Sequence, residues 1–170
     1  MIETQRLILR HWRTDDAEAL YRYASDARVS ELALWPRHTS VEMSRDVIEK
    51  YFLPEPSTFA VVLRSTGEPI GCIGLVTPGD EHYPPLPSER EIGYWIGRPH
   101  WCNGLMTEAL DAFATYCRDT LLLDSLLLTT DERNIASQRV AEKCGFRLFA
   151  RYDYEGQPSR AYRRIFQESV

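Results

Sequence analysis

The sequence predicts an α/β protein whose strands form one mixed β-sheet. Two stretches with strand patterning flank a glycine turn between residues 58 and 76, which indicates an antiparallel hairpin. Strand and helix patterns alternate between residues 91 and 144, which indicates a right-handed crossover with locally parallel pairing. The chain has 170 residues, of which 44% are hydrophobic, so we expect a single domain over residues 1–170.

The N-terminal region predicts a strand and then a helix. Gln5 to His11 alternates charged and apolar residues, as a half-buried strand does. Thr14 is the expected N-cap of the helix, because Asp15 and Asp16 would place negative charge in its first turn. The expected apolar face consists of Ala17, Leu20, Tyr21 and Ala24.

A second helix is expected from about Ser40. Thr39 and Glu42 stand at the spacing of a capping box, in which each side chain bonds the other residue's backbone N–H. The prolines at positions 54 and 56 should end this helix, because proline lacks the N–H that a helix interior needs.

The middle of the chain predicts a hairpin, a long loop and a further strand. Thr58–Arg64 and Pro69–Val76 read as strands around Gly67, which can adopt the positive φ that tight turns require. Thr77–Arg90 is rich in proline and acidic residues, so we expect a long exposed loop of the kind that often carries function. Glu91–Gly97 resumes strand patterning.

The remaining chain alternates helix and strand and closes with two strands. The expected elements are a helix at Asn103–Arg118, a strand at Leu123–Thr129, a helix at Asn134–Cys144 with Gly145 as its cap, and strands at Phe146–Tyr154 and Arg160–Phe166.

The charge and the cysteines narrow the function classes. The net charge of −5 disfavours general binding to nucleic acid or to an anionic membrane. The four cysteines are scattered without a C-x-x-C pair, and the histidines do not cluster with them, so we expect free thiols and no metal. The N-terminus lacks a signal-peptide core and no stretch could span a bilayer, which favours a cytoplasmic protein.

The segment from Trp101 to Ala109 carries the strongest signal for chemistry. It lies between a strand and an amphipathic helix, with Gly104 just ahead of the helix. The first backbone N–H groups of a helix are unpaired and lie at the positive end of its dipole, so they can hold a pyrophosphate. An ordinary turn is the competing interpretation, because one glycine ahead of a helix is commonplace.

Several stretches match one known family in order and spacing. They are Thr4–Arg10 with Asp16–Ala17, Ile70–Gly74, Glu91–Ile96, the residues Trp101, Gly104, Leu105, Thr107, Glu108 and Ala109, and the run Asp131, Arg133–Ser137, Arg139–Val140, Glu142–Lys143 and Gly145–Phe146. The chain thereby resembles the GNAT superfamily of N-acetyltransferases, in particular its RimJ/RimL-like branch. The resemblance implies a central mixed, twisted sheet that splays between its fourth and fifth strands and is flanked by about four helices.

The resemblance also implies how acetyl-CoA, the expected co-substrate, would bind. The backbone amides of Asn103, Gly104, Leu105, Met106 and Thr107 would hold the pyrophosphate, the strand residues Trp95 and Ile96 and the following Arg98 would contact the pantetheine arm, and Asn134 would face that arm from the other side. Met106 departs from the family's small residue, and its longer side chain could narrow the pyrophosphate groove. For Asn134, a plain helix N-cap is the alternative role.

Amide formation from a thioester needs a proton donor for the thiolate and a base for the amine. The resemblance implies Ser137 as the donor, and a tyrosine from elsewhere in the chain or solvent are the other possible donors. For the Ser137 hydroxyl itself, a bond back to its own helix is the alternative role. Glu91 is the first candidate for the base, followed by Asp153 and Glu155, with a solvated surface charge as the alternative for each.

The sequence and the resemblance together predict direct acetyl transfer from acetyl-CoA to a primary amine, without a metal. The acceptor could be a protein or peptide N-terminus, a polyamine or an amine-bearing antimicrobial compound. Trp35, His82 and Tyr83 should border the acceptor, and the acidic loop Gly79–Glu91 suits a cationic one. A homodimer is compatible with the family.

The alternative is a regulatory module that binds acyl-CoA with weakened catalysis. Three departures from the family pattern favour it, namely Met106, Ala141 in place of a helix tyrosine, and Thr129 in place of a strand glutamate.

Overall fold

The structure is a computed structural model that describes residues 1–166. Its contacts group the chain into two compact units, Met1–Gly74 with Tyr94–Ala109, and Leu75–Gly93 with the chain from Leu110 onward. The expected single domain over residues 1–170 stays a prediction, and its last residues, 167–170, lie outside the described range.

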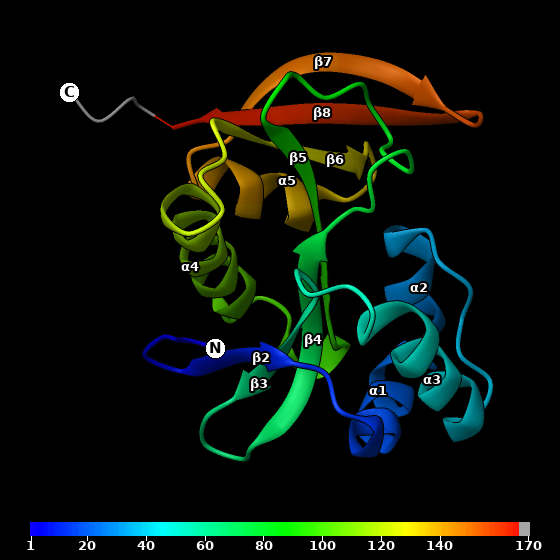
Figure 1. Ribbon diagram of the computed structural model, residues 1–170. Helices are drawn as coiled ribbons and strands as arrows, with labels where there is room; N and C mark the ends of the chain where they lie inside the picture. Colours follow the sequence, from blue (N-terminus) through cyan, green and yellow to red (C-terminus); the bar gives the residue numbers. More distant parts are fainter. Residues whose placement is uncertain (167–170) are drawn as a thin grey trace. The chain divides into compact units, whose positions relative to one another are not determined.

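The predicted α/β class with one mixed sheet is confirmed, and the strand order is β1-β2-β3-β4-β5-β6-β8-β7 (Figure 1). The strands are β1 (Ile2–Glu3), β2 (Leu7–His11), β3 (Phe59–Leu63), β4 (Glu68–Leu75), β5 (Glu89–Ile96), β6 (Ser125–Asp131), β7 (Arg147–Tyr154) and β8 (Gln157–Ile165). The helices are α1 (Ala17–Ala24), α2 (Ala27–Ala33), α3 (Val41–Val47), α4 (Leu105–Asp119) and α5 (Ile135–Lys143). Short turns of helix occur at η1 (Thr14–Asp16), η2 (Ile48–Phe52) and η3 (Arg98–His100).

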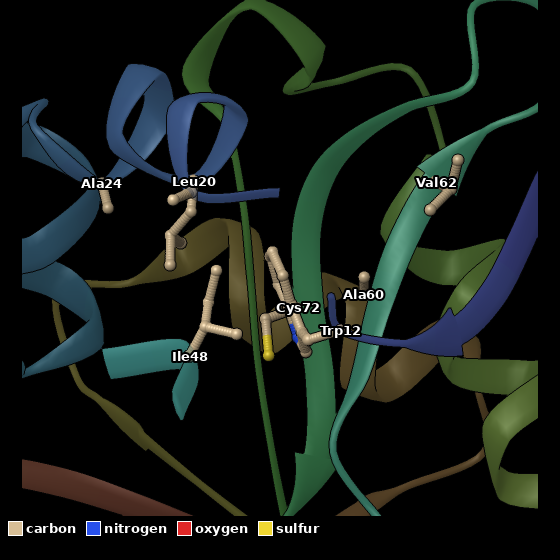
Figure 2. Close-up of a cluster of buried hydrophobic side chains, with 8 residues drawn as sticks. Trp12, Leu20, Ala24, Ile48, Ala60, Val62 and Cys72 are labelled. Carbon is tan, nitrogen blue, oxygen red and sulfur yellow. The ribbon is translucent and has the colours of Figure 1, made fainter. Parts of the chain in front are cut away.

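The first unit contains the antiparallel ladder from β1 to β4 and the helices α1, α2 and α3. Strand alternation turns Leu7 and Leu9 inward, and both are fully buried. A buried cluster joins the helices to the strands (Figure 2). Its members are Trp12, Ala17, Leu20, Ala24, Ile48, Ala60, Val62 and Cys72. This core fixes the inner face of α1, and Trp35 and Trp95 pack against its edge.

The start of the first helix differs from the prediction. Thr14 is not an N-cap but the first residue of the turn η1, and α1 begins at Ala17. The capping acceptor is Asp16, whose buried carboxylate accepts hydrogen bonds from the Arg13 backbone N–H at 2.9 Å and from the Arg10 guanidinium at 2.8 and 2.9 Å. These charge-assisted bonds fix the chain ahead of η1, whereas the Asp16 side chain caps none of the N–H groups of α1.

Two further predictions about the N-terminal helices were wrong. Tyr23, rather than Tyr21, lies on the buried face of α1. Ser40, rather than Thr39, caps α3, because its side chain accepts the Met43 N–H at 3.0 Å. The short helix α2, capped by Asp26, was not predicted.

The second unit contains a parallel pair followed by an antiparallel hairpin. Glu89–Ile92 of β5 pairs in parallel with Ser125–Leu128 of β6, which confirms the predicted parallel pairing. β6 then pairs with β8, and β8 with β7, in antiparallel register. Both β5 and β6 continue past their parallel ladder, to Ile96 and Asp131. Their predicted separation beyond it stays a prediction.

Within residues 1–166, no helix combines the length and the apolar character that crossing a lipid bilayer requires.

Candidate active site

The turn ahead of α4 is exposed and contains two residues with left-handed backbone conformation. Cys102 and Gly104 both have left-handed backbones, with φ of 60° and 72°, and Asn103 and Gly104 are exposed. A side chain at Gly104 would meet only Arg6 Nη2, at 3.6 Å from its Cβ, so this face of the turn is open. Binding of a pyrophosphate by the N–H groups of the first α4 turn stays a prediction.

Leu105 and Met106 fix that first turn from the inside. Both side chains are buried, and Met106 is only 6% exposed. The length of Met106 thus contributes to packing, and its effect on the width of a pyrophosphate groove stays a prediction. Thr107 is half-buried.

Glu108 ties the head of α4 to the N-terminal strand. Its carboxylate accepts hydrogen bonds from the Thr4 hydroxyl at 2.6 Å, the Arg6 N–H at 2.8 Å and Arg6 Nε at 2.7 Å. Burial alone would raise the pKa of Glu108, but these bonds outweigh it and lower that pKa. Arg6 also donates from Nη1 to the Asn103 carbonyl at 2.9 Å. Two motifs about a hundred residues apart thus form one brace for the turn.

The end of β5 is fixed by its own contacts. Trp101 Nε1 donates to the Ile96 carbonyl at 2.8 Å, and the Gly97 N–H donates to the Ile70 carbonyl at 2.7 Å. A Cβ at Gly97 would overlap the ring of Tyr23, so only glycine fits there. The backbone of Ile96 is therefore held rigidly.

The expected site residues near Ile96 differ in environment. Trp95 is half-buried and meets the ring of Trp35 edge-on, with centroids 5.6 Å apart. Trp35 packs against the buried cluster of the first unit. Its Nε1 is buried without a hydrogen-bond partner among residues 1–166. Arg98 is exposed.

In the second unit, Glu91 is at the centre of a hydrogen-bonded cluster. Its side chain is 2% exposed. It accepts hydrogen bonds from the His82 backbone N–H at 2.7 Å, His82 Nδ1 at 2.8 Å and the Thr129 hydroxyl at 2.6 Å. The hydrogen bond to Glu91 raises the pKa of His82 although burial opposes it. The structure thus brings Glu91 and His82 together.

Glu89 anchors the other end of the same loop. Its side chain is fully buried and accepts Arg163 Nε at 2.6 Å, Arg163 Nη2 at 3.0 Å, the Ser125 hydroxyl at 2.8 Å and the Leu86 N–H at 2.8 Å. Burial raises the pKa of Glu89, but these donors outweigh it and the pKa is lowered. Glu89 and Glu91, two residues apart on one face of β5, each hold one backbone N–H of the loop.

Tyr83, expected at the acceptor, packs into an aromatic group. It meets Phe149 at 5.3 Å and Tyr152 at 5.1 Å between ring centroids, and His82 meets Tyr154 at 4.9 Å. Burial raises the pKa of Tyr152 to about 12, so its phenol keeps its proton at neutral pH.

The start of α5 is built on Asp131. This buried carboxylate accepts hydrogen bonds from the Arg133 N–H at 2.8 Å and from Arg133 Nε at 2.9 Å. The turn brings Asn134 into the N-cap position, where its side chain accepts the Ser137 N–H at 3.1 Å. The alternative prediction that Asn134 is the N-cap of α5 is therefore confirmed. This capping bond uses only the oxygen of the side-chain amide.

The second-choice bases lie in the β7–β8 turn. Asp153 accepts the Gly156 N–H at 2.8 Å, so it shapes the turn, and Glu155 is exposed with φ of 50°. Within residues 1–166, no group of three or more His, Cys, Asp or Glu side chains is arranged to hold a metal ion. That the reaction needs no metal stays a prediction.

Sequence reasoning missed Arg6 and the positive role of Thr129. Arg6 belonged to a matched motif, but its partner Glu108 lies far away in the sequence. Thr129 was noted only as a missing glutamate, whereas its hydroxyl supports Glu91.

Several proteins with similar sequences or structures are named as acetyltransferases. The sequence is 30% identical to the uncharacterized N-acetyltransferase YoaA of Bacillus subtilis over 150 residues, 86% of this chain and 82% of the relative. The structure matches a GNAT-family acetyltransferase from Bacillus anthracis with a TM-score of 0.81, 23% identity and coverage of 96% and 97%. It matches a putative ribosomal-protein-serine acetyltransferase from Vibrio cholerae with a TM-score of 0.76, 26% identity and 96% coverage of both chains.

More distant structures share the fold. They are RimL in complex with coenzyme A (TM-score 0.78, 21% identity), AAC(6′)-Ib in complex with ribostamycin and coenzyme A (0.74, 18%), and the spermidine N-acetyltransferase of Vibrio cholerae with CoA and spermine (0.76, 16%). The family model described as "acetyltransferase (GNAT) domain" matches residues 6–147. The chain therefore belongs to the GNAT family of N-acetyltransferases, and it is an acetyl-CoA-dependent acyltransferase.

Proposed function

We propose that this enzyme transfers the acetyl group of acetyl-CoA directly to a primary amine and that it belongs to the RimJ/RimL-like branch. The observation that carries the proposal is the open turn ahead of α4, with Gly104 at φ 72° and Glu108 and Arg6 bracing it. That geometry presents helix N–H groups to an anion, as a CoA pyrophosphate requires.

Each predicted contact to CoA is assigned to one group. The N–H groups of Asn103–Thr107 bind the pyrophosphate, and the backbone of Trp95, Ile96 and Arg98 binds the pantetheine arm. Asn134 contributes its amide NH₂, because its oxygen caps α5.

The reaction forms one C–N bond and breaks one C–S bond. An amine with a pKa of about 10.4 is mostly protonated at neutral pH, so it first gives a proton to a base. The neutral nitrogen then attacks the thioester carbon, and the thiolate leaves. Ser137 relays a proton to the sulfur, and the second nitrogen proton replaces it. No covalent acyl-enzyme forms.

The acceptor class rests on charge and on the proteins that share this fold. RimL is a ribosomal protein acetyltransferase, and the structures of other neighbours contain ribostamycin or spermine. The loop from Gly79 to Glu91 carries Asp80 and Glu81, which favours a cationic acceptor such as a peptide N-terminus or a polyamine. Free thiols at all four cysteines suit a reducing cytoplasm.

The test is release of free thiol from acetyl-CoA in the presence of spermine, ribostamycin or a peptide with a free N-terminus, with binding of acetyl-CoA measured in parallel. Saturable thiol release with at least one amine is expected. Saturable binding without thiol release for every amine would contradict direct transfer and favour a weakened acyl-CoA-binding module. Sedimentation of the same sample tests the possible homodimer.

A further inference from the structure

The base for the acceptor amine is the open question of the proposed reaction. Glu91, the first candidate, has little capacity left for it. Three donors already occupy its carboxylate, and its side chain is 2% exposed. A substrate ammonium would have to compete with His82 and Thr129 for this buried carboxylate.

His82 has the opposite character. One third of its side chain is exposed, and its Nδ1 is fixed to Glu91 Oε1 at 2.8 Å. An ionised carboxylate has no proton to give, so Nδ1 carries the proton and donates it. The ring therefore keeps Nε2 as its basic nitrogen, and within residues 1–166 nothing hydrogen-bonds to Nε2.

We propose that His82 Nε2 is the base that takes the proton of the acceptor amine, and that Glu91 and Thr129 are positioning residues for it. This inference rests on the proposed function. The hydrogen-bonded order of the three side chains is Thr129 to Glu91 to His82. A carboxylate that fixes the tautomer and orientation of an imidazole also stabilises the imidazolium that forms.

Two separate contacts hold His82, one to its backbone and one to its ring. Glu91 Oε2 accepts the His82 backbone N–H at 2.7 Å, so the loop position does not depend on the imidazole. The ring of Tyr154 meets the imidazole edge-on and limits its rotation. A His82→Ala variant therefore keeps the loop anchor and loses only the ring.

The charged groups that act on the His82 imidazole are all carboxylates. They are Glu91 on β5, Asp80 in the same loop and Glu155 in the β7–β8 turn, and all three raise the pKa of His82 above its ordinary value of 6.5. The neutral ring, which is the active form, therefore becomes more abundant as the pH rises through that raised pKa.

The proton balance closes without another reactant. The ammonium gives one proton to Nε2, directly or through a water, and the amine nitrogen bonds to the thioester carbon while the C–S bond breaks. The nitrogen's second proton replaces the one that Ser137 gives to the thiolate. The imidazolium returns its proton to solvent after the product leaves.

Glu91→Gln tests the arrangement because it is nearly isosteric. The His82 backbone N–H can only donate, so the new amide must turn its oxygen toward it. The amide NH₂ then faces Nδ1, which becomes an acceptor, and the ring proton moves to Nε2. The basic nitrogen is thereby blocked without loss of the imidazole.

The first experiment compares wild type, His82→Ala, Glu91→Gln and Thr129→Val. Thiol release is followed with the amine, among spermine, ribostamycin and the peptide, that the wild type acetylates fastest. At pH 7, kcat/KM should fall about 100-fold in His82→Ala, a usual contribution of a general base. The KM for acetyl-CoA should not change, added imidazole should restore part of the rate, and the deficit should shrink as the pH approaches the amine's own pKa. His11→Ala, which removes an exposed histidine stacked on Phe59, is the matched control.

The second experiment is NMR of the ¹⁵N-labelled imidazole, which needs no turnover. At a pH above the raised pKa of His82, the wild type should show a neutral ring with its proton on Nδ1, and Glu91→Gln should show the proton on Nε2. If the wild type acetylated an amine and His82→Ala did so equally fast, this inference would be overturned and the proposed function would stand. If the wild type acetylated none of the three amines, the proposed function would fail and this inference with it. A wild-type proton on Nε2 would also overturn it.

Discussion

Removal of the Glu89 carboxylate should cost this protein a large part of its stability. The side chain is fully buried and accepts four hydrogen bonds, two of them from Arg163. Arg163 is 17% exposed and lies 4.0 Å above the ring of Phe149, so it cannot turn freely into water. Glu89→Ala therefore leaves a largely buried guanidinium without its counter-charge.

The expected loss follows from that geometry. Breaking a buried ion pair by removing one partner typically costs about 3–5 kcal/mol, which corresponds to a Tm decrease of roughly 6 to 20 °C for a chain of this size. Replacing both Glu89 and Arg163 by methionine removes both charges and fills the space. The double variant should be more stable than Glu89→Ala.

The assay is urea unfolding followed by circular dichroism, with Asp119→Ala as the matched control. Asp119 pairs with Arg118 on the surface, where both side chains are about half exposed, so its loss should have no measurable effect. A loss below about 1 kcal/mol in Glu89→Ala, or a double variant no more stable than that single variant, would refute the reasoning.

Four other predictions concern the site and pH. Gly104→Trp should weaken CoA binding at the open turn, as measured by calorimetry; unchanged affinity would place the phosphates elsewhere. Asn134→Asp keeps the cap oxygen and removes the NH₂ donor, so it should lower CoA affinity without the roughly 1 kcal/mol stability loss of Asn134→Ala. Ser137→Ala should mainly lower kcat and leave the KM for acetyl-CoA unchanged. The lowered pKa of Glu89 means that its stabilisation is complete above its unfolded value and is lost as the pH falls through the folded value, so wild type but not the double methionine variant should lose this increment in acid titrations.

The sequence predicted those elements whose signal is local. The crossover from β5 through α4 to β6 was predicted because apolar periodicity changes clearly at each boundary. The hairpin of β3 and β4 was predicted because Gly67 marks its turn, and its φ is 72°. Local patterns failed at helix starts: Thr14 opens the turn η1 instead of capping α1, and the Asp16 carboxylate binds the Arg13 N–H and the Arg10 guanidinium.

The candidate site was predicted residue by residue but not as an arrangement. A glutamate in an acidic loop reads as a solvated charge, yet Glu89 and Glu91 are buried. The donor that makes burial of Glu89 possible, Arg163, lies 74 positions later in the sequence. No local pattern reports such a partner, because register between β6 and β8 brings it there.

The two glutamates of β5 divide their work by the chemistry of their donors. Glu89 meets a guanidinium, which stays charged at every accessible pH, so this ion pair is lost only in acid, where the Glu89 carboxylate itself takes up a proton. Glu91 meets an imidazole and a hydroxyl, and the imidazole changes protonation near neutral pH. A loop fixed by the first residue can therefore present a titrating side chain at the second without losing its position. This is why the loop can be long and proline-rich and still hold the His82 imidazole in one orientation.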